Sequence, residues 1–227
     1  MYKYLIFYIL ISIISNSLYS FNSKDINLFY NDYYSSNKYK AEIIKSKISD
    51  MTYNNIYGLV YSMSLEDDKQ KYLYLKDLIN KNNNYMSSND SDYLISVAHL
   101  MAYIVYYSSL GEKIDYGKKS KAIYEKVLSS DKNNFHALLG VAIGYMKAPA
   151  IAGGSNKKAL EYFTLALNNA KENYQKYLAY TWMSQYYFKL KDVNQYDSYV
   201  KMAESIYSSG NYLKNAINRN IELKKSL

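Results

Sequence analysis

The chain has 227 residues with one proline, eight glycines and no cysteine. The lack of cysteine excludes disulfides, thiolate metal sites and a cysteine nucleophile. The scarcity of turn residues argues against a β-rich fold. The formal net charge is +8, yet the only arginine is Arg219. Nucleic-acid readers favour arginine, so the lysine-rich charge indicates a solvated surface and no nucleic-acid partner.

The first twenty residues are ordered as in a secretory signal peptide. Lys3 supplies a positive charge, an apolar run covers residues 4–14, and a polar stretch of small residues ends at Ser20. This order predicts cleavage after Ser20 or Ser17 and a periplasmic or secreted protein that is not integral to the membrane. The apolar run is shorter than the ~20 residues of a spanning helix. A membrane tether formed by an uncleaved signal and an ordinary hydrophobic first helix are the alternatives.

From about Lys24 onward, apolar residues recur at i, i+3, i+4 and i+7, the spacing of amphipathic helices. Polar clusters rich in Asn and Ser separate these segments and are typical of loops and helix starts. The acidic residues 66–68 follow Ser64, and this spacing predicts a capping box that begins at Ser64 and not a metal site. The predicted fold class is therefore all-α.

Two residue patterns alternate along the C-terminal half of the chain. The first combines small and aromatic residues at Ala159, Phe163 and Ala166. The second occupies the preceding helical segment at Leu138, Val141, Ala142 and Tyr145. Further copies of the two patterns use Ser120, Tyr124, Val127, Tyr180, Met183, Ser184, Tyr187, Tyr196, Val200 and Ala203. Small residues let paired helices approach closely, and aromatic residues fill the space to the next pair. Gly140 and Gly144 likewise predict a close-packing face.

Through these patterns, residues 118–207 resemble the tetratricopeptide repeat (TPR) family. Ser120 and Tyr196 depart from the family, which prefers alanine at both positions. The resemblance implies antiparallel helical hairpins stacked as a right-handed solenoid, in which the first helices line one surface. The expected organisation is a signal peptide in residues 1–20, divergent helical hairpins in residues 21–110, and TPR-like repeats with a C-terminal helix in residues 111–227.

An insertion in residues 147–158 separates two of the repeat helices. We expect one helix to end before Pro149 and Ser155 to cap the next. Together with the tail in residues 211–218, the insertion is similar to the T component associated with tripartite ATP-independent periplasmic (TRAP) transporters. This narrower resemblance implies an alternative function, that of a periplasmic accessory protein of such a transporter.

The function favoured by the TPR resemblance is the binding of a protein or peptide partner in the cell envelope. By the family's register, a concave groove would be lined by His136, Leu139, Ile143, Met146, Thr181, Gln185 and Phe188. The Ile, Met and Phe side chains would offer an apolar strip for an interface. The alternative is that these side chains merely pack against neighbouring helices.

The sequence contains no recognisable catalytic constellation. Its two histidines are His99, which stands among apolar residues and is expected in the interior, and His136, which falls in the first turn of a helical segment. Neither has a second ligand at metal-binding spacing, and no Ser-His-Asp order is recognisable. We therefore predict no cofactor, no metal and no enzymatic activity, with an uncharacterised enzyme as the second alternative function.

Overall fold

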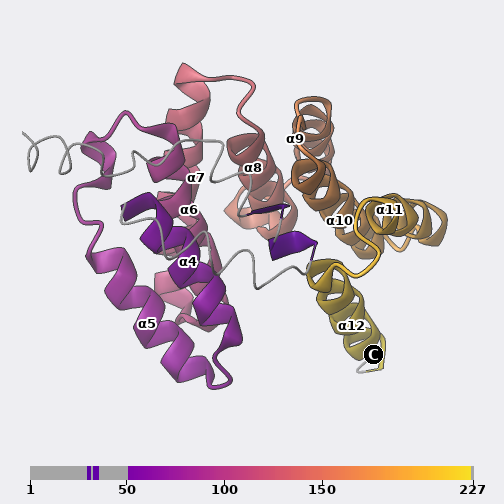
Figure 1. The fold of residues 1–227 in the computed structure, drawn as a ribbon, viewed down its shortest axis with the longest axis horizontal. Helices are drawn as coiled ribbons and strands as arrows, with labels where there is room; N and C mark the ends of the chain where they lie inside the picture. Colours follow the sequence, from indigo (N-terminus) through magenta and orange to yellow (C-terminus); the bar gives the residue numbers. More distant parts are fainter. Residues whose placement is uncertain (1–29, 32, 36–50, 226–227) are drawn as a thin grey trace, which may run out of the picture.

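A computed structural model describes residues 30, 31, 33–35 and 51–225 (Figure 1). The described residues form α-helices and short 3-10 helices joined by turns, with no strand among them, and the predicted all-α class is confirmed. The predicted signal peptide in residues 1–20 lies outside the described residues. Within the described part of the chain, no helix has the length and apolar character needed to cross a bilayer.

The helices follow one another with short connections. The 3-10 helices are Tyr85–Ser87, Val105–Tyr107 and Ala150–Ala152. The α-helices are α4 (Met51–Ser64), α5 (Asp68–Asn80), α6 (Ser91–Ile104), α7 (Leu110–Ser130), α8 (Phe135–Lys147), α9 (Asn156–Asn168), α10 (Asn173–Leu190), α11 (Val193–Ile206) and α12 (Asn211–Lys225).

Several α-helices begin at a side chain that accepts a hydrogen bond from a backbone N–H of the first turn. These N-caps are Asp67, Asp90, Asn134, Ser155 and Asp192. The prediction for Ser155 is confirmed. The prediction of a capping box at Ser64 is wrong, because α4 continues to Ser64. The Asp67 carboxylate takes the capping role for α5 and accepts from the Gln70 N–H at 2.7 Å.

Successive helices pack in pairs, and the first helices of the pairs are neighbours (Figure 1). The pairs are α6–α7, α8–α9 and α10–α11, while α6 contacts α4 and α8, and α8 contacts α10. In the last pair, Phe188 lies 5.7 Å from Tyr196 beside the turn, and Tyr180 lies 6.2 Å from Tyr199 further along. These ring pairs show that α10 and α11 run antiparallel. The α6–α7 pair spans residue 110, the expected boundary between the two halves, and one apolar cluster covers both sides of it.

The residues of the two sequence patterns lie between the helices. Those at most 3% exposed are Tyr124, Val127, Leu138, Val141, Ala142, Ala159, Phe163, Ala166, Met183, Ser184 and Ala203. Tyrosine rings fill much of the remaining space, as where Tyr145 of α8 meets Tyr162 of α9 at 5.7 Å. The prediction that the small residues mark helix–helix contacts is thus confirmed at Ala159 and Ala166.

We expect Ala159→Tyr to destabilise the protein by about 1–3 kcal/mol, because the larger ring overpacks a contact that leaves no exposed surface. The matched control is Lys157→Tyr in the same helix, since Lys157 is exposed and its replacement meets no packed neighbour. Urea unfolding measures both variants. Equal losses of stability at the two positions would contradict the described register of α9.

Glycines have different roles in α8 and in the insertion that follows it. A Cβ atom at Gly140 would lie 2.4 Å from the Tyr124 ring, whereas one at Gly144 would meet nothing within 4 Å. The close-packing prediction is confirmed for Gly140 and wrong for Gly144, which is on the exposed face of α8. As expected, α8 ends before Pro149. Gly153 then adopts the left-handed conformation (φ 83°) that glycine accommodates without strain.

Candidate functional site

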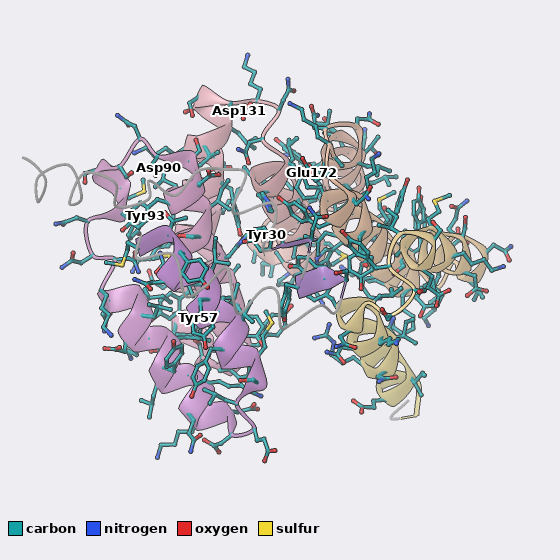
Figure 2. All side chains as sticks on the ribbon, viewed as in Figure 1. Tyr30, Tyr57, Asp90, Tyr93, Asp131 and Glu172 are labelled. Carbon is teal, nitrogen blue, oxygen red and sulfur yellow. The ribbon has the colours of Figure 1, made fainter. Side chains whose placement is uncertain are left out.

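A cavity of about 200 Å³ lies where α6, α8 and α10 begin. Figure 2 labels Asp90, Asp131 and Glu172 in the turns before these three helices, with Tyr30 below them in the view. The cavity is lined by side chains from α4, from all three helix starts and from the segment before α4. Its polar lining includes Tyr30, Asp92, Asn133, His136, Tyr174 and Gln175. It therefore joins parts of the chain that are distant in sequence.

The backbone N–H groups at the three helix starts already have side-chain partners. Asp90 accepts from the N–H groups of Asp92 and Tyr93, and Asn134 accepts from the N–H of Ala137 at 3.2 Å. At α10, Glu172 and Gln175 form a reciprocal capping box. Side chains, and not unpaired helix ends, consequently provide the polar character of the cavity.

A histidine–tyrosine hydrogen bond forms the inner wall of the cavity. His136 Nε2 lies 3.0 Å from the hydroxyl of Tyr174, and the Gln175 amide donates to the same hydroxyl at 3.3 Å. The ring of Tyr30 stacks on Tyr174 with centroids 5.0 Å apart and lies 5.6 Å from His136. Tyr174 is 1% exposed, so the pair is fixed by packing on both sides.

Burial keeps this wall uncharged at neutral pH. Burial, together with the nearby His99, lowers the pKa of His136 to about 3. Burial also lowers the pKa of His99 to about 4 and raises the pKa of Tyr174. The wall can thus exchange hydrogen bonds with a ligand, but it offers neither a charged base nor an ionised nucleophile. Charge enters at Asp92, whose pKa is raised by burial and then by Asp90, and at the exposed Lys171.

The structure separates the predicted groove residues into two groups. His136 lines the cavity, and Ile143, Gln185 and Phe188 are half-buried. The other three are 5%, 2% and 1% exposed and lie in the interior, namely Leu139, Met146 and Thr181. In this conformation they pack against neighbouring helices, which was the alternative left open by the sequence. A partner-binding role stays a prediction for the first group.

Sequence reasoning missed two parts of the site. It treated the two histidines as separate, whereas their rings lie 5.6 Å apart in an edge-on arrangement. It also had no signal for Tyr30, which reaches His136 only through the tertiary fold. Periodicity reports which face of a helix is buried, but it does not report which distant segment covers that face. Within the described residues, no group of three or more potential metal ligands is found.

No protein-family model matches the chain, and no curated protein matches its sequence.

Proposed function

We propose that the chain is an exported helical-repeat scaffold that binds a protein or peptide partner in the cell envelope. The observation that carries the proposal is the cavity built jointly by the first turns of α6, α8 and α10. Each of these helices is the first of a packed pair. A surface shared by successive pairs is the kind on which helical-repeat proteins bind extended partners.

A TPR-like, right-handed solenoid is the arrangement that we infer for these pairs. Its support is that residues of the small-and-aromatic patterns recur in α7, α9 and α11 and lie at helix contacts, as Ala159, Ala166 and Ala203 do with no exposed surface. Export to the envelope rests on the order of the first twenty residues.

The alternative function, a T-component-like accessory of a TRAP-type transporter, requires a pore or hydrophobic pocket for a ligand. The cavity is instead lined mainly by polar side chains, among them Asp131, Asn133, Asn169 and Lys171. Such a lining suits the hydrogen-bonding groups of a peptide or a protein loop better than an apolar ligand. This chemistry favours the scaffold over the transporter accessory.

Site-specific photocrosslinking in a secretory host tests the proposed function. A photoreactive amino acid at Lys171, on the rim of the cavity, should capture a discrete envelope protein, because a partner in the groove passes over this position. The same amino acid at Lys157, which is exposed but lies on α9 away from the cavity, is the matched control. The products are identified by mass spectrometry.

A partner that crosslinks from Lys171 and not from Lys157 is the expected result. Capture from Lys157 alone, or the same set of proteins from both positions, would show that the cavity face is not the binding surface. A chain that stays in the cytoplasm with its N-terminus uncleaved would overturn the proposed location in the cell envelope.

A further inference from the structure

The inner face of the helix pairs is already occupied by a short piece of the chain itself. Residues 30, 31 and 33–35, here called the tyrosine segment, lie between α4 and the α8–α10 region (Figure 1). Tyr30 is 7% exposed and packs on Tyr174 and His136. One turn further, Tyr34 stacks near Tyr174 at 6.3 Å and meets the edge of Tyr212 at 5.6 Å.

Polar contacts attach the tyrosine segment to parts of the chain that are far away in sequence. The Tyr207 hydroxyl donates to Asn31 Oδ1 at 2.6 Å, and the Ser209 hydroxyl donates to the Ser35 carbonyl at 3.4 Å. Tyr33 reaches the sulfur of Met63 in α4 at 3.7 Å. Side chains of α4, of α12 and of the turn before α12 therefore hold the segment in place.

The tyrosine segment has the properties of a docked ligand. Residues 30, 31, 33 and 34 are helical, and the N–H of Ser35, in the turn that follows, donates to the Asn31 carbonyl at 3.0 Å. Isolated helices shorter than about 12–15 residues are marginal in water, so a short peptide with this sequence depends on the receiving surface for a helical conformation. Two aromatic anchors one turn apart on a groove formed by other helices is a recurring mode of peptide recognition.

The helices that receive the segment are also joined to one another by contacts that do not involve it. His136 and Tyr174 are joined directly by their hydrogen bond, and the hydroxyl of Tyr177 accepts from the backbone N–H of Leu213 at 2.9 Å, which fixes α12 to α10. These contacts belong to helices that also touch one another directly, α8 with α10 and α10 with α12. Vacating the segment would therefore expose a preformed aromatic groove.

We propose that this face is a receptor for short helices carrying two tyrosines one turn apart, and that the tyrosine segment occupies it in cis until a partner displaces it. That the tyrosine segment regulates the binding of an envelope partner rests on the proposed function. The binding of a short helical peptide to this face can be tested independently of that function. A tethered occupant acts at an effective concentration on the order of millimolar. A free peptide should consequently bind the unmodified chain weakly.

The experiment uses a fluorescently labelled peptide with the sequence of residues 28–37 and the full-length chain. The receptor variant is Tyr30→Ala with Tyr34→Ala, which removes both anchors in cis. Its matched control is Tyr57→Ala with Tyr61→Ala, which removes another stacked tyrosine pair one turn apart, on α4. Fluorescence anisotropy gives the peptide affinity. Trp182, the only tryptophan, lies 6.4 Å from Tyr212 and gives an independent signal from the groove.

We expect the peptide to bind the Tyr30/Tyr34 variant at least about 10-fold more tightly than the unmodified chain, because competition in cis is removed. The control variant should bind like the unmodified chain, and a peptide with alanine at both tyrosine positions should bind neither. Equal binding to all three proteins, or no binding to a Tyr30/Tyr34 variant that still unfolds cooperatively, would overturn the proposal.

A second variant decides the case in which the double variant fails to fold. Tyr34→Ala alone removes the less buried anchor and should still raise peptide affinity. If this single variant also loses cooperative unfolding, the segment is core and the proposal is wrong. Peptide binding without any envelope crosslink at Lys171 would contradict the proposed function only. An envelope crosslink at Lys171 that is unchanged in the Tyr30/Tyr34 variant would contradict only the inference of a displaceable occupant.

Discussion

Acidification from about pH 7.5 to about pH 5 should lower the free energy of unfolding by about 4 kcal/mol through the two histidines alone. The folded pKa values of His99 and His136 are about 4 and about 3, because burial disfavours the charged ring. In the unfolded chain both return to about 6.5. Below that value the unfolded chain binds protons that the folded chain does not, so stability falls as the pH falls. Urea unfolding at several pH values measures the slope.

Replacing both histidines with glutamine isolates their contribution. The His99→Gln, His136→Gln variant should show a nearly flat stability across the same pH range, and each single variant should lose about half of the slope. Glu112 does not interfere, because hydrogen bonds from Tyr72, Lys76 and Ser109 lower its pKa to about 2, so its effect begins only near its ordinary value of about 4.5. An unmodified protein whose stability barely changes over this range would show that the histidines are accessible to protons in the fold.

The substitution Asn55→Ala should destabilise the protein by about 3 kcal/mol, because it leaves buried polar groups without partners. Asn55 and Asn82 exchange two amide hydrogen bonds, of 3.0 and 2.9 Å. The Asn55 amide also donates to the Ser96 hydroxyl at 3.0 Å. These three side chains are at most 2% exposed and connect α4, the end of α5 and α6. Thermal and urea unfolding of the purified chain measure the loss.

The control lies one position earlier on the same helix. Asn54 is exposed, and Asn54→Ala should change the stability by less than about 0.5 kcal/mol, as surface substitutions usually do. The two variants share the same chemical change and the same helix propensity. Similar effects at Asn54 and Asn55 would mean that the buried amide network does not form.

The same asparagines show where sequence reasoning stops. Helical periodicity identified the class of fold, and the small residues Ala159 and Ala166 were correctly placed at helix contacts. Asn82 stands in a run of asparagines that is typical of a loop, yet it is 1% exposed. Its burial depends on a partner in another helix, and nothing in the local composition distinguishes it from the exposed Asn83.

The candidate site was predictable only where it follows helix register. His136 was placed in the first turn of a helix and does line the cavity. Met146 was placed by the same register on a groove, but it is 2% exposed. Helix register gives the direction in which a side chain points, and it does not show whether other residues cover that side chain. The cover supplied by Tyr30 is a tertiary contact, and a single sequence carries no local signal for such a contact.

The bond between Tyr207 and Asn31 joins positions separated by 176 residues, and it alters how the helical array must fold. In an open array each pair contacts only its neighbours, so folding can begin anywhere and spread, and the ends fray first. Here the chain closes on itself, which raises the mean sequence separation of its contacts and slows folding relative to an open array. Fraying of α12 and of the turn before it would remove contacts from the tyrosine segment, because Tyr207 and Ser209 in that turn donate hydrogen bonds to the segment. The C-terminal end of the array is therefore coupled to the tyrosine segment and not only to the neighbouring helices α10 and α11.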